Sequence, residues 1–301
     1  MCINFKIRKK TFFDLTHESL SCAKQDLNTK LLALGTTEGC LKIAKIQNNN
    51  TVLANKFVQN LQINSVDWLA NGLVCMSLDL HGLALYDPMK NKLAFRQLYD
   101  ENIRHMRAVS NNEILCWYRD GMAILVDLRS KTKQLEFKSK DSVTCANINT
   151  QNRNIIYTTS IPGTQLNIWD MRYTKRGKYI SMSKQISNTH TCDLEMIDGL
   201  LFATDNQSNV FRISAGGNFK SKIIEGDGQG RAGRLHANDF FKTAFFTTQN
   251  AIYSINNKAI KMYDSNMPLI GCTGSKDDLF VYSTKRIVNF VISPNLFLNH
   301  K

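Results

Sequence analysis

The chain has 301 residues, of which 43% are hydrophobic and 21% charged, and this composition is ordinary for a soluble globular protein. No apolar run approaches the roughly 18 residues that a membrane-spanning helix needs, so the sequence predicts no membrane span. The formal net charge of +13 favours an acidic partner, such as nucleic acid, an acidic protein segment or an anionic surface.

At the N-terminus, MCINFKIRKK carries its positive charges after a short apolar stretch, and no h-region or cleavage site follows. This order is wrong for a secretory signal. The eight cysteines are far apart in the sequence, which excludes local C-x-x-C zinc knuckles. We therefore expect an intracellular protein, in the cytoplasm, the nucleus or both, whose cysteines are small buried thiols.

Along the chain, seven segments share one pattern: a β-rich run, a tight turn and a second β-rich run. This is the pattern of a β-hairpin. The hairpins span residues 31–46, 72–89, 113–130, 154–173, 199–215, 242–257 and 277–293. Their turns recur about every 41 residues, and further β-like stretches precede and follow the hairpins, so each repeat predicts four short strands.

The fourth hairpin ends in NIWDMR, in which Trp169 and Asp170 match the strand-ending Trp-Asp pair of WD40 repeats. Asp87 and Asp127 hold the place of that aspartate in the second and third repeats, and His17 holds the place of the family's histidine. The chain therefore resembles a divergent WD40-repeat protein. The resemblance covers nearly the whole chain through its period, and it implies an all-β, seven-bladed β-propeller.

The two ends of the chain fit a closed ring. Residues 9–16, KKTFFDLT, predict an outer strand, and little chain follows the last hairpin to supply a fourth strand of its own. In the family that the chain resembles, such an N-terminal strand completes the last blade. We expect residues 1–301 to form a single propeller domain, closed by a strand at about 9–16, because closure removes an exposed sheet edge.

Residues 226–234, GDGQGRAGR, contain three glycines in the G-x-G-x-x-G spacing of dinucleotide sites. That motif binds a pyrophosphate where a strand leads in and a helix leads out. Here a β-like run follows the glycines, so the sequence predicts no nucleotide cofactor. We expect a mobile connection between blades five and six, in which Arg231 and Arg234 bind a carboxylate or phosphate of a partner, with an inert linker as the alternative.

A second basic segment, MRYTKRGK at residues 171–178, connects the third and fourth predicted strands of blade four. Its candidate partner-binding residues are Tyr173, Lys175, Arg176 and Lys178, which suit an acidic peptide or a phosphate backbone. An ordinary solvated connection is the alternative.

The sequence shows no motif for a catalytic residue, metal ligand or cofactor, because its six histidines form no H-x-x-x-H pair and no G-x-S-x-G elbow or P-loop occurs. It therefore favours a non-catalytic scaffold or complex subunit that binds acidic protein partners. One alternative is a nucleic-acid-associated propeller in RNA processing or ribosome assembly. Another is a propeller enzyme whose site lies at the channel mouth, built from several blades.

Overall fold

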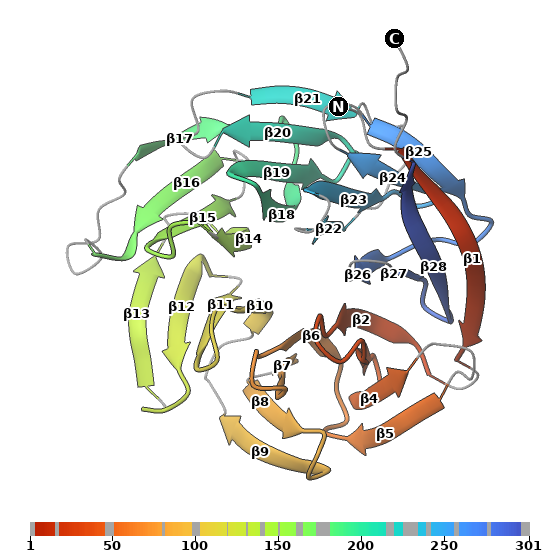
Figure 1. Ribbon diagram of the computed structural model, residues 1–301. Coiled ribbons are helices and arrows are strands. Elements are labelled where there is room, and N and C mark those ends of the chain that lie inside the picture. The colour runs from red at the N-terminus through yellow and green to blue at the C-terminus, as the bar shows by residue number, and fades with distance from the viewer. Residues whose placement is uncertain are drawn as a thin grey trace.

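The protein is described by a computed structural model over residues 4–15, 18–45, 51–79, 82–97, 103–118, 120–130, 132–138, 142–149, 151–160, 165–172, 181–214, 220–224, 234–238, 242–255, 259–275 and 278–295. These residues form seven four-stranded antiparallel sheets, arranged as blades around a central axis (Figure 1). The predicted all-β propeller with seven blades is confirmed. Within the described ranges, no helix is long and apolar enough to cross a membrane.

The first four blades follow chain order from the inner to the outer strand. Blade 1 contains β2 (Leu20–Gln25), β3 (Leu32–Thr36), β4 (Cys40–Lys45) and β5 (Thr51–Phe57). Blade 2 contains β6 (Ile63–Trp68), β7 (Val74–Leu78), β8 (Gly82–Asp87) and β9 (Lys92–Gln97). Blade 3 contains β10 (Ile103–Ala108), β11 (Glu113–Tyr118), β12 (Met122–Asp127) and β13 (Thr132–Lys138). Blade 4 contains β14 (Val143–Ile148), β15 (Ile155–Ser160), β16 (Gln165–Asp170) and β17 (Ser181–Gln185).

The last three blades complete the ring. Blade 5 contains β18 (Thr191–Ile197), β19 (Leu200–Asp205), β20 (Val210–Ser214) and β21 (Lys220–Ile224). Blade 6 contains β22 (Leu235–Asn238), β23 (Thr243–Thr247), β24 (Ala251–Ile255) and β25 (Ala259–Asp264). Blade 7 contains β26 (Gly271–Gly274), β27 (Asp278–Tyr282), β28 (Arg286–Asn295) and, from the other end of the chain, β1 (Asn4–Asp14).

Blade 7 closes the ring as predicted, by antiparallel pairing of β1 with β28. The register sets Phe12 opposite Val288 and Asn4 opposite Asn295. The strand is longer than the 9–16 expected from the sequence, because the ten-residue β28 offers pairing partners as far back as Asn4. β1 and β28 thus lie in one sheet, and β1 covers the outer edge of blade 7 (Figure 1).

The middle strands of the blades are buried on both faces because each sheet packs against two neighbouring sheets. All residues of β3, β7, β12 and β23 are buried, and these strands accordingly read as nearly continuous apolar runs. The seven described cysteines are free thiols; five are buried, as expected, while Cys40 and Cys192 are partly exposed. Burial raises the pKa of the Cys22 thiol to about 11, so it stays protonated near neutral pH.

The inner strands share a β-bulge at one position, which aligns them around the axis. Blades 1 to 5 show the register shift between Leu20/Cys22, Ile63/Ser65, Ile103/His105, Val143/Cys145 and Thr191/Asp193. A bulge inserts an unpaired residue and re-aims the side chains that follow it. Because the shift recurs at the same height, the residues after it form layers of side chains around the central channel.

Candidate functional site

Two layers of side chains line the central channel, one residue per blade in each layer. In blades 1 to 5 the first layer comes directly after the bulge and contains Cys22, Ser65, His105, Cys145 and Asp193. Arg234 and Cys272 hold the corresponding place in blades 6 and 7. The second layer lies two residues further along each inner strand and contains Lys24, Asp67, Arg107, Asn147, Glu195, His236 and Gly274. All seven positions of the second layer line a cavity of about 280 Å³.

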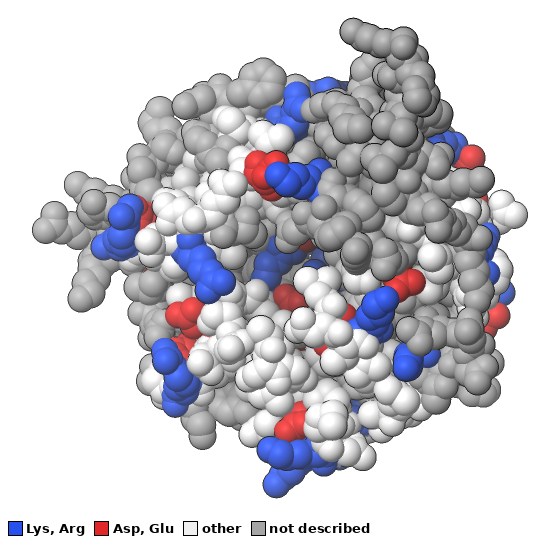
Figure 2. Space-filling model, viewed as in Figure 1, with Lys and Arg blue, Asp and Glu red and all other residues white. Residues whose placement is uncertain are grey.

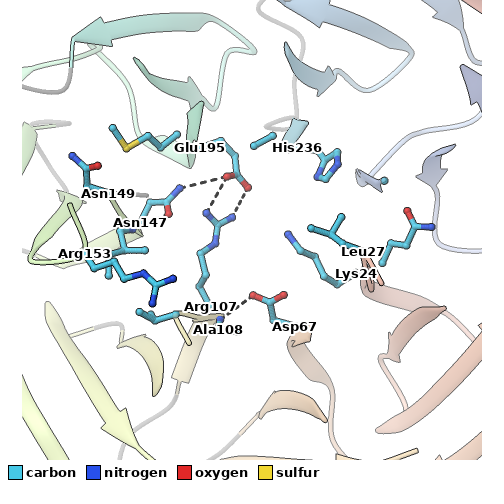
Figure 3. Close-up of a pocket in the computed structure, with 16 residues that line it drawn as sticks. Lys24, Leu27, Asp67, Arg107, Ala108, Asn147, Asn149, Arg153, Glu195 and His236 are labelled. Atoms are coloured by element: carbon cyan, nitrogen blue, oxygen red, sulfur yellow. Dashed lines mark hydrogen bonds and ion pairs between the residues drawn. The ribbon is translucent and has the colours of Figure 1, made fainter. Parts of the chain in front are cut away.

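An ion pair crosses the channel in the second layer (Figure 3). Arg107 of β10 donates from Nη1 to Glu195 Oε2 of β18 at 2.9 Å, and its Nη2 donates to Oε1. Asn147 of β14 donates from Nδ2 to the same carboxylate at 3.4 Å and to the Leu194 carbonyl at 2.9 Å. Blades 3, 4 and 5 are therefore joined by one side-chain network.

The surroundings of this pair shift both pKa values toward the charged forms. Burial raises the pKa of Glu195, but the charges of Arg107 and Lys24 outweigh it, so that the carboxyl pKa is lowered overall. Burial also disfavours the charged form of Arg107, but the negative charge of Glu195 outweighs this effect, so the guanidinium pKa is raised. The pair is an ionised bridge between a buried carboxylate and a partly buried guanidinium.

The carboxylate of Asp67 is also engaged. Its Oδ1 accepts from the Trp68 backbone N–H and its Oδ2 from the Ala108 backbone N–H, each at 2.9 Å. The second of these bonds ties blade 2 to blade 3. On the side of the channel formed by blades 2 to 5, each second-layer side chain is therefore hydrogen-bonded.

Blades 6, 7 and 1 present the opposite situation. The imidazole of His236 is only 5% exposed, and its Nε2 has no hydrogen-bond partner in the described part of the chain. Gln25 of blade 1, 2% exposed, has neither amide atom bonded within the same residues. Burial, and then the charge of Lys24, lower the pKa of His236 to about 3, so its ring is neutral. Blade 7 contributes Gly274, which has no side chain.

Lys24 extends from β2 toward the middle of the channel (Figure 3). Among the described residues, none forms an ion pair or hydrogen bond with its ammonium group, whose charge instead lowers the pKa values of Glu195 and His236. The cavity wall thus contains a cation without a direct partner among the described residues, and unbonded polar atoms of His236 and Gln25 are buried in the residues that line it. Buried polar groups of this kind normally have a partner in a folded protein, which is supplied by protein, water or a ligand.

The cavity is bordered by Leu27 and Arg153, which lie in the turns between the first and second strands of blades 1 and 4. Leu27 is 68% exposed. The face of the ring in Figure 2 shows basic side chains around the rim, several beside acidic ones, and a hollow at its centre. Five rim cations are paired: Lys30 with Asp278, Lys90 with Asp87, Arg129 with Asp127, Arg172 with Asp170, and Lys242 with Asp198. For Arg153, no acidic partner exists within the described ranges.

The first layer is more closed than the second. Arg234 contacts His105 through Nη1 and Nε2 at 2.5 Å, and the His105 ring stacks on Trp117 with centroids 4.8 Å apart. Burial, followed by the charge of Arg234, holds the pKa of His105 well below its usual range, so the ring is neutral and accepts this bond. Asp193 accepts from the Leu235 backbone N–H at 3.0 Å.

Of the partner-binding residues predicted from the sequence, the structure describes Arg234 alone. Tyr173, Lys175, Arg176, Lys178 and Arg231 lie outside the described residues. Arg234 directly precedes β22, and its backbone exchanges hydrogen bonds with Thr247, so its guanidinium is held inside the channel. A strand and no helix follows the glycine motif, as expected. Partner binding by these residues stays a prediction.

Apart from Arg234, the sequence analysis missed the channel residues. Their signal is a position in the first strand of blades 2 to 6, the third residue of SVDW, HMRA, CANI, DLEM and RLHA, where polar side chains recur. Comparison with known proteins adds no assignment, since no protein-family model and no curated protein matches the chain. The geometry of the channel is therefore the basis for a functional conclusion.

Proposed function

We propose that the protein is a divergent member of the WD40-repeat class and acts as a non-catalytic scaffold that binds acidic protein segments at the mouth of its channel. Membership is supported by blade 4, where the Trp169 indole donates to Thr158 Oγ1 at 2.8 Å across β16 and β15. This matches part of the hydrogen-bond network that the WD40 resemblance implies. Asp170, the second residue of the Trp-Asp pair, ends β16.

The main support for the proposal is that basic side chains on the face with the cavity are paired at the rim but unpaired at the cavity. Around the rim, five Lys or Arg side chains are already paired with carboxylates of this chain. At the mouth of the cavity, Arg153 has no such pair among the described residues, and the exposed Leu27 also borders the mouth. An apolar side chain and an unpaired cation at one mouth suit a short segment that carries both an apolar and an acidic side chain.

The test is affinity purification of the full chain from its native source, with and without nuclease, followed by identification of the retained proteins. We expect the partners to persist after nuclease treatment. The variant Arg153→Glu should reduce their recovery about tenfold, because a repulsive charge replaces an attractive one at a central contact. Lys90→Glu makes the same charge change at the rim and should leave recovery unchanged.

Two outcomes would contradict the proposal. Loss of all partners on nuclease treatment would favour the nucleic-acid-associated propeller, in which Lys and Arg neutralise phosphates. Equal recovery by Arg153→Glu and Lys90→Glu would show that the channel mouth is not the contact.

A further inference from the structure

The interior of the cavity holds a set of groups that the scaffold function does not use. Its volume of about 280 Å³ lies near the lower end of small-molecule pockets, which span roughly 300–1,000 Å³. Liquid water occupies about 30 Å³ per molecule, so a compact organic molecule of several heavy atoms fits as well as a water cluster does. The wall is lined by side chains from all around the ring, which gives a small ligand contacts on every side (Figure 3).

The charges in the cavity wall determine whether the cavity favours an anionic or a cationic ligand. The two carboxylates of the second layer are already satisfied, Glu195 by Arg107 and Asp67 by two backbone N–H groups. The positive charges of Lys24 and Arg153 are not paired with any described carboxylate. An anion entering the cavity would therefore meet unpaired donors, while a cation would meet unpaired positive charge. The cavity is complementary to an anionic group.

The remaining unbonded atoms indicate a second chemical feature. His236 makes a hydrogen bond to the backbone at Gly274 that raises its pKa, as expected where the ring N–H donates to a carbonyl. In the neutral ring, Nε2 then carries a lone pair, and this atom has no partner in the described residues. Gln25 adds an unbonded amide, with both a donor and an acceptor. A hydroxyl group of a ligand can donate to such an acceptor.

We propose that the channel binds a small soluble molecule that carries a carboxylate or phosphate group together with a hydroxyl group. The oxyanion lies against Lys24 and is approached from the mouth past Arg153. The hydroxyl group lies toward His236 and Gln25, on the side where Gly274 leaves the wall without a side chain. This site lies inside the cavity and is separate from the protein contact proposed at the mouth of the same channel.

The probes are citrate, glucose 6-phosphate and inorganic phosphate, titrated by calorimetry into the full chain at constant ionic strength, with glucose as the uncharged control. We expect at least one of the hydroxylated anions to bind with a Kd of about 1 mM or tighter, and glucose to show no binding. Citrate alone would identify a carboxylate ligand, and glucose 6-phosphate alone a phosphate ester. Inorganic phosphate should bind at least tenfold more weakly than the tighter of these, because it cannot reach both subsites.

Matched variants locate the binding. Lys24→Met keeps the length of the side chain without its charge and should lower the affinity at least tenfold. Lys90→Met makes the same change at the rim and should leave the affinity unchanged. Failure of both hydroxylated anions to bind more tightly than about 10 mM would mean that the channel holds water only and would overturn the proposal. Equal loss in the two variants would do the same, since it would indicate diffuse surface attraction.

The same variants separate this proposal from the scaffold function. Lys24→Met protein that loses anion binding but keeps its partners in the affinity purification supports two separate functions of the channel. Arg153→Glu protein that loses its partners but still binds the anion at the Lys24 subsite supports the same separation. Each proposal therefore fails on a different variant and by a different readout.

Discussion

The two sides of the channel differ in how the polar side chains of the second layer are hydrogen-bonded. In blades 2 to 5, Asp67, Arg107, Asn147 and Glu195 bond to one another or to the backbone of the adjacent blade. In blades 6, 7 and 1, the Nε2 atom of His236 and the ammonium group of Lys24 have no hydrogen-bond partner in the described residues, and Gly274 adds no side chain to the layer. We call these the bonded side and the open side. The ring is held by its bonded side and by strand pairing, so the open side is available for a ligand.

On the open side, stability comes from the closure of blade 7. Deleting residues 1–14 removes β1 and exposes the edge of β28, which pairs with it along its whole length. We expect a loss of about 5 kcal/mol or more in the free energy of unfolding, a large part of the total for an ordinary domain. Thermal melting, monitored by circular dichroism, detects this loss of stability. A truncation of residues 1–3 serves as the control, and an unchanged melting temperature for the longer deletion would contradict closure by β1.

On the bonded side, Glu195→Ala leaves the partly buried Arg107 guanidinium without its counter-charge. Removing one partner of a buried ion pair typically costs about 3–5 kcal/mol. Urea unfolding of the variant should show a loss in this range, and Lys90→Ala, which removes a cation at the exposed rim, should change little. A loss for Glu195→Ala no larger than that of the rim variant would show that the bonded side does not hold the ring.

The open side should also be visible in the pH dependence of stability. The pKa of His236 is about 3 in the folded protein and about 6.5 in an unfolded chain. The unfolded state therefore binds a proton that the folded state excludes, and stability falls as the pH drops below about 6.5. Between about pH 4 and 6, His236→Gln should lose stability less steeply than the wild type, by about 1.4 kcal/mol per pH unit. Identical slopes would show that His236 is not held neutral.

The smallest effect compares two amides in the channel. Asn147 is bonded through its side chain to Leu194 and Glu195, whereas Gln25 has no bonded amide atom in the described residues. Asn147→Leu should cost about 1–3 kcal/mol, because it leaves buried polar partners unsatisfied, while Gln25→Leu should be neutral or slightly stabilising. Denaturant midpoints of the two variants decide this. A larger loss for Gln25→Leu would reverse the assignment of the two sides.

The fold could be predicted from the sequence because a propeller repeats one local unit. The hairpin pattern, its period and the N-terminal strand at 9–16 were sufficient for the seven blades and the ring closure. β1 both begins and ends earlier than expected, at Asn4 and Asp14, since its extent depends on its pairing with the distant β28. Local patterns thus determine this architecture almost completely.

The channel could not be predicted in the same way. Lys24 and Gly274 lie at opposite ends of the sequence, and they become neighbours in one layer only through the register of seven inner strands. Arg234 shows the same limitation. It follows a run of glycines in the sequence, and tertiary pairing with Thr247 brings it into the channel beside His105. No local motif records either arrangement.

The most direct test of the open side as a binding site is a crystal structure of the full chain, grown with whichever of citrate or glucose 6-phosphate binds more tightly. The account predicts electron density for the anion inside the second layer, with an oxyanion oxygen within hydrogen-bond distance of Lys24 Nζ. A cavity filled only by ordered water, with the anion absent or bound elsewhere on the surface, would contradict it.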